Sequence, residues 1–263
     1  MQLPIPNVIL FGETGGGKSS IINLLADSEV APTASSARGC TFQSQCYRVN
    51  VSGSMFDIHD TVGLNEGETG SVPNPDAIIQ LYSLLQSLNT GVNLLVFCMR
   101  GPRLRSVAHD NWRFFEDIVC QKKVPIVLVI TGLEHEDVMD DWWLNNKSAF
   151  QEQGMFPHGV ACITAIKGKN NAFEAEHQES RVKMKNILIK YVLEKPWKIQ
   201  PVEWFHEIAV TTFKTPWCPW VRKCTESYWT RNRRNNESLS PFGGGSEKDG
   251  RTAVRYYSSS RLQ

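Results

Sequence analysis

The sequence has no long apolar run and no strong net charge. Its longest apolar stretches, such as "NLLVFCM" and "PIVLVI", have the length of strands and fall far below the roughly 20 residues that span a bilayer. The net charge of +1 gives no overall bias toward nucleic acid or anionic membranes. The first residues lack the basic start and apolar core of a secretory signal, so we expect a cytoplasmic protein.

The cysteines lack the pattern of a disulfide framework or a zinc site. There are seven of them, an odd number, and Cys98 and Cys162 lie inside apolar runs. Cys218 and Cys224 have no further Cys or His at zinc-binding spacing. This usage predicts reduced, mostly buried thiols and no structural metal.

Short apolar runs alternate with longer amphipathic stretches up to about residue 195. The runs predict strands at Asn7–Phe11, Thr41–Val51, Met55–His59, Val92–Met99, Pro125–Thr131 and Val160–Thr164. The stretches predict helices at Lys18–Ala26, Pro75–Leu88, Arg105–Cys120, Met139–Gln153 and Glu174–Leu193. In the last helix, apolar residues from Val182 to Val192, Ile189 among them, predict a broad buried face.

Two kinds of strand are present. "VPIVLVI" is apolar without alternation, which is typical of parallel strands covered by helices on both faces. "TFQSQCYRVNV" and "SMFDIHD" alternate instead, and "NVSGS" between them supplies a turn. The prediction is an α/β fold: a three-layer α/β/α arrangement with a mostly parallel sheet and one antiparallel edge strand.

The stretch "GETGGGKS" matches Gly-x4-Gly-Lys-Ser between a predicted strand and a predicted helix. In that setting backbone N–H groups surround phosphate oxygens, and side chains at Gly15, Gly16 and Gly17 would block the approach. Lys18 then contacts the β- and γ-phosphates, and the Ser19 hydroxyl binds Mg²⁺. The alternative is a strand-to-helix turn without a ligand. The predicted phosphate-binding residues are Gly12, Glu13, Thr14, Gly15, Gly16, Gly17, Lys18, Ser19 and Ser20.

The stretch "FDIHDTVG" places Asp60 at a strand end and Gly63 three residues later. This Asp-x-x-Gly resembles the second-strand signature of the P-loop GTPases. By that resemblance Asp60 holds Mg²⁺ through water, and the Gly63 amide senses the γ-phosphate. The alternative for Asp60 is a helix or turn cap.

Between these motifs, "APTASSARGCTFQSQ" contains the threonine expected to close over Mg²⁺. We choose Thr41, with Thr33 as the alternative. The "Gly-Cys-Thr" setting and "DTVGLNEG" resemble the septin-like branch of these GTPases. Within it they resemble the immunity-associated and chloroplast-import-receptor (Toc-like) group, particularly fungal proteins with a single G domain. The resemblance covers about residues 5–195.

The base-reading segment departs from the family pattern Asn/Thr-Lys-x-Asp. Here Thr131 and Glu134 hold the outer positions, and Gly132 replaces the lysine whose stem covers the guanine ring. His135 is a candidate for stacking on the base, the alternative being an exposed loop histidine. The fifth motif is matched by Thr164 and Ala165, with the Ala165 amide expected near the guanine O6. A carboxylate at position 134 pairs with the donors of guanine and poorly with adenine, so the implied ligands are GTP and GDP with Mg²⁺.

The resemblance also bears on catalysis. Leu64 stands where many relatives have the glutamine that orients water, which implies slow intrinsic hydrolysis. Dimerisation across the nucleotide face, or a partner protein, would then complete a molecular switch. Two alternatives remain: a non-hydrolysing nucleotide-dependent binding module, and an adenine-specific ATPase of another P-loop branch.

We expect the chain to divide into a G domain over 1–195, a Trp/Pro-rich extension over 196–230 and a disordered basic tail over 231–263. Five of the eight tryptophans lie between Trp197 and Trp229. Residues 222–263 hold nine Lys/Arg against four Asp/Glu. The extension either packs back on the G domain or attaches peripherally to a membrane surface. Nucleic-acid binding lacks fold-level support.

Arg38 gives the first testable prediction. It precedes Thr41 by three residues, the spacing that G-protein α subunits use for an arginine supplied in cis, so with Lys18 and Thr41 it is a predicted catalytic residue. If Arg38 stabilises charge on the γ-phosphoryl group, Arg38→Ala lowers the single-turnover rate of GTP hydrolysis by about 10³. A change within about twofold would leave Arg38 as a solvated loop cation.

Overall fold

The computed structural model of the chain describes residues 4–32, 45–61, 81, 84–85, 87–104 and 106–198. Its centre is a six-stranded sheet of order β2-β3-β1-β4-β5-β6. The strands are β1 (Asn7–Gly12), β2 (Gln45–Val51), β3 (Ser54–Asp60), β4 (Leu94–Arg100), β5 (Ile126–Thr131) and β6 (Gly159–Cys162). All neighbours are parallel except β2 and β3, which form an antiparallel hairpin at one edge. The predicted fold class is confirmed.

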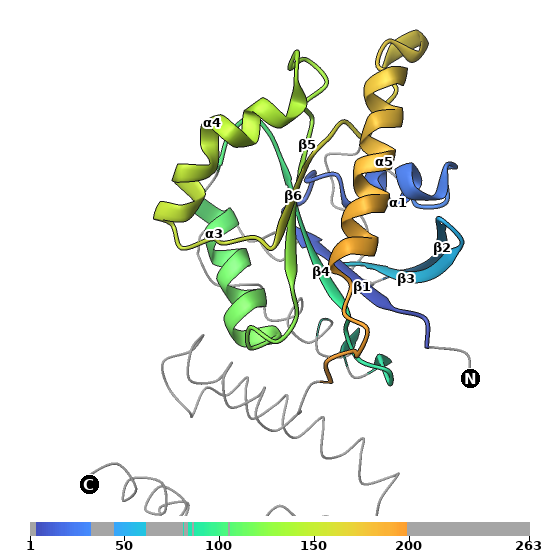
Figure 1. Ribbon diagram of the computed structural model, residues 1–263, viewed down its shortest axis with the longest axis vertical. Coiled ribbons are helices and arrows are strands. Elements are labelled where there is room, and N and C mark those ends of the chain that lie inside the picture. The colour runs from blue at the N-terminus through green and yellow to red at the C-terminus, as the bar shows by residue number, and fades with distance from the viewer. Residues whose placement is uncertain are drawn as a thin grey trace, which may run out of the picture. The chain divides into compact units, whose positions relative to one another are not determined.

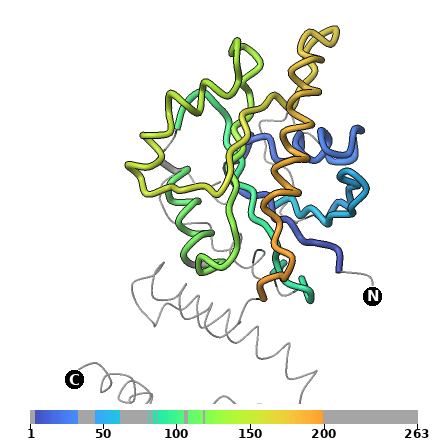
Figure 2. The backbone as a smooth tube through the Cα atoms, in the orientation of Figure 1, coloured from blue at the N-terminus to red at the C-terminus, as the bar shows by residue number. Residues whose placement is uncertain are grey.

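Helices cover both faces of this sheet. Figure 1 shows α1 (Lys18–Ala26) and α5 (Glu174–Tyr191) on one face, and α3 (Ser106–Arg113) and α4 (Met139–Glu152) on the other. The tube in Figure 2 follows the order of the elements along the chain: α1 lies between β1 and β2, α3 between β4 and β5, and α4 between β5 and β6, whereas α5 comes after the last strand. The short segments η1 (Phe114–Val119) and η2 (Lys169–Asn171) complete the described elements.

The helix predicted over Arg105–Cys120 is divided into two parts. α3 ends at Arg113, and η1 continues as a π-helix in which the Cys120 amide donates to the Phe115 carbonyl, 3.0 Å away. In this wider turn, neighbouring side chains diverge less than in an α-helix. The adjacent Phe114 and Phe115 are both buried. The Phe115 ring stacks on Phe11 of β1 with centroids 3.8 Å apart, so this segment packs against the sheet.

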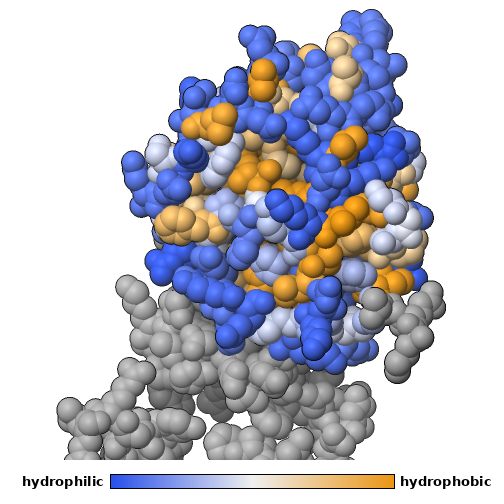
Figure 3. Space-filling model, in the orientation of Figure 1, coloured by the Kyte–Doolittle hydropathy of each residue, from blue (hydrophilic) through white to orange (hydrophobic). Residues whose placement is uncertain are grey.

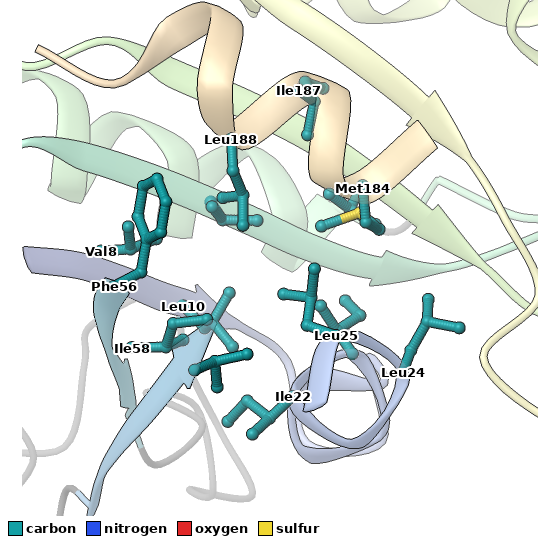
Figure 4. Close-up of a cluster of buried hydrophobic side chains, with 14 of the residues drawn as sticks. Val8, Leu10, Ile22, Leu24, Leu25, Phe56, Ile58, Met184, Ile187 and Leu188 are labelled. Carbon is teal, nitrogen blue, oxygen red and sulfur yellow. The ribbon is translucent and has the colours of Figure 1, made fainter. Parts of the chain in front are cut away.

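The core on the α1 and α5 face joins residues far apart in the sequence. Figure 4 shows side chains from β1, β3 and α1 meeting those of α5. Val8, Leu10, Ile22, Leu25, Ile58, Met184 and Leu188 are each no more than 1% exposed. Each truncation of such a side chain to alanine costs about 2–5 kcal/mol, so this cluster is a main source of stability.

The buried face of α5 is narrower than predicted. Met184, Ile187 and Leu188 are buried, but Val182 and Ile189 are 58% and 48% exposed. On a helix these two lie on the side opposite Met184 and Leu188, and the sheet reaches only one side. Figure 3 shows one face of the molecule, a mainly hydrophilic surface interrupted by apolar side chains. Within the described residues no helix has the length and apolarity needed to cross a bilayer.

After α5 the chain returns to the start of β4. The Leu193 amide donates to the Asn93 carbonyl at 3.1 Å, and the Asn93 side chain donates to the Leu193 carbonyl at 2.7 Å. Trp197, from the predicted extension, exchanges two 2.8 Å backbone hydrogen bonds with Val92. The backbone as far as Trp197 is thus attached to the sheet.

A buried polar network lies at the start of β1. The Asn7 amide donates to Asn93 Oδ1 at 2.9 Å, and its side chain donates to Thr90 Oγ1 and the Gly91 carbonyl, both at 2.7 Å. The His59 ring lies 3.1 Å from Asn7 Oδ1. Burial lowers the pKa of His59 and favours its neutral form. One side chain thus joins β1, β3 and the turn before β4.

We predict that Asn7→Ala lowers the free energy of unfolding by about 2–4 kcal/mol, because buried partners lose their hydrogen bonds. The control is Asn145→Ala, an exposed asparagine on α4, for which we expect less than about 0.5 kcal/mol. Urea unfolding monitored by circular dichroism measures both. Equal effects of the two substitutions would contradict a structural role for the network.

Candidate functional site

The predicted site residues gather where the parallel strands end. The carboxyl ends of parallel strands meet at one edge of a sheet, and ligands of open α/β sheets bind there. This edge carries the loop Gly12–Ser19 after β1, Asp60 at the end of β3, the segment Thr131–Glu134 from β5 and Thr164 after β6. The fold therefore unites motifs spread over 150 residues of sequence.

The loop after β1 leads directly into α1. Inside it the Gly16 amide donates to the Glu13 carbonyl at 3.1 Å, and α1 begins at Lys18. The cap residue Gly17 has φ 89° and supplies no side-chain cap. The first backbone N–H groups of α1 therefore meet this loop with the partial positive charge of a helix N-terminus.

The glycines have a structural reason besides room for phosphate. A Cβ at Gly16 would lie 2.7 Å from the Cys98 carbonyl oxygen, and one at Gly17 would lie 2.8 Å from Thr131 Cγ2. A Cβ at Gly12 would overlap the same Cys98 oxygen. A Cβ at Gly15 would meet no atom within 4 Å apart from those of its chain neighbours. Gly12, Gly16 and Gly17 thus let the loop pack on β4 and β5, whereas Gly15 borders open space.

Lys18 is 8% exposed, and its ammonium group remains inside the loop. Lys18 Nζ donates to the Gly12 carbonyl at 3.2 Å and to the Glu13 carbonyl at 2.9 Å. Burial of an ammonium is costly without such acceptors. The loop thus holds a positive charge where the sequence predicts phosphate.

Ser19 and Asp60 form the second half of the site. Ser19 Oγ donates to Asp60 Oδ2 at 2.7 Å. Asp60 Oδ1 is buried and has no hydrogen-bond partner among the described residues. Burial raises the pKa of Asp60, opposed by the Ser19 hydrogen bond and the Lys18 charge. A buried carboxylate oxygen without a partner, beside a hydroxyl, is a donor set that fits Mg²⁺.

The described residues contain no cluster of three or more His, Cys, Asp or Glu side chains that could hold a metal. Ser19 and Asp60 alone would leave most positions around Mg²⁺ open. Mg²⁺ commonly keeps several waters and takes one or two carboxylates together with phosphates. The geometry therefore suits a metal that arrives with a phosphate ligand.

Thr131 holds the base-reading segment against the phosphate-binding loop. Its buried hydroxyl lies 3.2 Å from the Gly16 carbonyl and 3.3 Å from the Met99 carbonyl. Three residues later, Glu134 is half-buried, and its Oε2 has no hydrogen-bond partner among the described residues. Thr131 is thus hydrogen-bonded to the loop, whereas one carboxylate oxygen of Glu134 has no partner among the described residues.

The fifth motif adjoins this segment. The Leu133 amide donates to the Ile163 carbonyl at 3.4 Å, and the buried Thr164 amide donates to Ser180 Oγ at 3.0 Å. Ala165, the next residue in this loop, is half-buried. His135 is exposed, and its ring lies edge-on to Phe173 with centroids 5.3 Å apart. Stacking of His135 on a base remains a prediction.

Several predicted residues lie outside the described part of the chain: Thr41 with its alternative Thr33, and Arg38, Gly63 and Leu64. Sequence reasoning also missed a residue. Arg100 ends β4, and its side chain lies beside Gly132. The available signal was a charged residue at the end of an otherwise buried strand, at the edge where ligands of open α/β sheets bind.

The loop packing predicts different results at two neighbouring glycines. Gly16→Ala places a Cβ against the Cys98 carbonyl, so we expect a loss of about 1–3 kcal/mol in unfolding free energy without any ligand. Gly15→Ala is the control, because its φ of 78° costs about 1 kcal/mol but its Cβ meets no atom. Urea unfolding distinguishes them. A larger loss at Gly15 would contradict the packing argument.

Comparisons with known proteins agree with this geometry. The family described as 50S ribosome-binding GTPase matches residues 7–132. Over 104 residues the chain is 33% identical to immune-associated nucleotide-binding protein 10 of Arabidopsis thaliana. This alignment covers 38% of this chain and 22% of the relative. The match thus spans about a fifth of the relative's length.

Two solved structures share the fold. Era in complex with MgGDPNP and nucleotides 1506–1542 of 16S ribosomal RNA aligns with a TM-score of 0.51 and 18% identity. The alignment covers 76% of this chain and 60% of the Era chain. Toc33 from Arabidopsis thaliana in complex with GDP and Mg²⁺ aligns with a TM-score of 0.50 and 16% identity. This alignment covers 72% of this chain and 87% of the Toc33 chain.

Identities this low show the fold alone, so the predicted resemblance to fungal single-G-domain proteins and to the septin-like branch stays a prediction. The family match is more specific, because it contains the loop at Gly12–Ser19 and the Asp60 carboxylate. The chain thus has the α/β fold of the P-loop GTPases, and over residues 7–132 it is similar to the ribosome-binding GTPase family.

Proposed function

We propose that this chain is a GTP-binding molecular switch that hydrolyses GTP slowly. The observation that carries the proposal is the joining of two half-sites. Lys18 and the loop amides form a site for phosphate, and Ser19 with Asp60, 2.7 Å apart, forms one for Mg²⁺. The GTPase family match over residues 7–132 supports guanine nucleotide as the ligand.

The residues of the two half-sites divide the work. The Lys18 ammonium would exchange its carbonyl acceptors for phosphate oxygens, which are more strongly negative. Ser19 and Asp60 would hold Mg²⁺, which neutralises phosphate charge when bound. Asp60 Oδ1 would gain the partner that it lacks among the described residues. Thr131 would keep the loop in place as the nucleotide binds.

Glu134 supports guanine over adenine. Its Oε2 is buried without a described partner, and a carboxylate accepts hydrogen bonds from guanine N1 and N2. Adenine presents an acceptor at N1, which would face this carboxylate unfavourably. The Leu133–Ile163 hydrogen bond joins the base-reading segment to the strand end before the fifth motif, and we propose that the Ala165 amide approaches the base.

Efficient GTP hydrolysis would need a water-orienting group from outside the chain. Leu64 has no group that orients water, so self-association across the nucleotide face, or a partner, would complete the site. Phosphate release per molecule that rises with protein concentration would support self-association. Release at background at every concentration would favour a non-hydrolysing binding module. Tighter binding of ATP than GTP would favour an ATPase.

Location and the C-terminal region belong to the proposal as well. The free, buried thiols of Cys98, Cys120 and Cys162 support a cytoplasmic location. The extension over 196–230 and the basic tail over 231–263 are proposed to provide peripheral membrane contact. Vesicle flotation of the full chain against a chain ending at residue 200 separates this from packing on the G domain. Equal partitioning would remove the membrane contact.

A nucleotide titration tests the role of Glu134. We expect the chain with Mg²⁺ to bind GTP at least about tenfold more tightly than ATP, and Glu134→Gln to lose about tenfold or more in GTP affinity. Because the new amide is a donor, this variant should improve binding of XTP relative to GTP. Glu136→Gln, at an exposed glutamate of the same loop, is the control. Equal behaviour of the two variants would remove Glu134 from the base site.

A further inference from the structure

Arg100 lies beside the base-reading segment because of strand register. β4 and β5 are parallel, and Arg100, the last residue of β4, is paired with Thr131 of β5. The next residue, Gly101, donates its amide to the Thr131 carbonyl at 2.8 Å. A Cβ at Gly101 would lie 2.8 Å from the Leu133 side chain. The end of β4 is thus closely attached to the segment from Thr131 to Leu133.

The side chain of Arg100 occupies the space above Gly132. A Cβ at Gly132 would lie 3.2 Å from Arg100 Cγ and from Arg100 Nε, and 3.8 Å from Cδ. Gly132 has φ 79°, a conformation that residues with a side chain rarely adopt. The stem of Arg100 thus runs where the side chain of residue 132 would begin. In the related GTPases that residue is the lysine whose stem covers the ring.

The exposure of these residues fits a ligand-facing group. Arg100 is exposed at the edge that carries the phosphate-binding loop. Gly132 beneath it is half-buried, and Glu134, two residues further on, carries the buried oxygen without a described partner. A cationic side chain from the end of β4 thus lies beside the segment after β5 that carries the Glu134 carboxylate. The cation is suited to the face of a purine and the carboxylate to its edge.

We propose that Arg100 replaces the missing lysine and covers the face of the purine ring. The inference rests on the proposed function and names a residue that determines base affinity within it. A guanidinium is planar, always charged and weakly hydrated, so it stacks on π-systems better than an ammonium does. Because β4 supplies the guanidinium of Arg100 at this place, position 132 can be glycine. A lysine at 132 would compete with Arg100 for one space.

The test compares ligands with and without a base. Mg-GTP and inorganic tripolyphosphate are titrated by calorimetry into the full chain, Arg100→Ala and the control Arg113→Ala, an exposed arginine on α3. We expect Arg100→Ala to weaken GTP binding roughly 3- to 30-fold, the range of a cation–π contact, and to leave tripolyphosphate binding within about 1.5-fold. Arg113→Ala should change neither.

A second pair of variants tests the shared space. Gly132→Lys in the wild-type chain should weaken GTP binding, because its side chain meets Arg100. The same substitution in the Arg100→Ala chain should recover part of the affinity that Arg100→Ala loses. Thermal melting without ligand identifies variants that do not fold, and for these the single Arg100→Ala comparison decides.

The possible outcomes distinguish failure of the proposed function from failure of the role assigned to Arg100. A wild-type chain that binds no guanine nucleotide would overturn the proposed function itself. Wild-type binding with GTP affinity unchanged in Arg100→Ala would overturn only the assignment of Arg100. An equal loss for GTP and tripolyphosphate would also overturn it, because Arg100 would then contact phosphate instead of the base.

Discussion

The site depends on one close contact, between the loop after β1 and the ends of β4 and β5. The Cys98 carbonyl lies against Gly12 and Gly16, and the Thr131 hydroxyl reaches the Gly16 carbonyl. Side chains at these glycines would force the loop or the strand to shift, because a backbone carbonyl in a close-packed sheet moves only at a cost in packing. The loop is thereby held in shape without a ligand, which lowers the ordering cost of binding one.

The loop and the end of β3 carry two buried groups of opposite charge, Lys18 and Asp60. Lys18 and Asp60 are largely removed from water, and each is costly when isolated. Lys18 is satisfied by two loop carbonyls, whereas Asp60 has one oxygen on Ser19 and one without a described partner. Burial raises the pKa of Asp60, and the Lys18 charge opposes that rise. This imbalance favours a cation beside Asp60 and an anion beside Lys18.

The opposite end of the sheet explains how this frame stays rigid. Asn7 and Asn93 connect the starts of β1 and β4, and Asn93 also holds Leu193 after α5. Trp197 continues this attachment through Val92. Because β1 and β4 are fully buried between these two ends, displacement at one end would disturb the packing along the whole strand. Structural hydrogen bonds thus lie at one end and the candidate site residues at the other.

Local patterns in the sequence determined the strands, the antiparallel edge, the glycine-rich loop proposed to bind phosphate and the carboxylate at Asp60, because each depends on residue type and spacing within a few positions. Only the tertiary structure decided what depends on neighbours across the sheet. It placed Arg100 over Gly132 through the β4–β5 register, committed Thr131 to the loop, and left Val182 and Ile189 exposed on α5. Apolar periodicity shows that a helix has a buried side but not how far its neighbours extend, and a missing side chain does not show which distant residue fills its space.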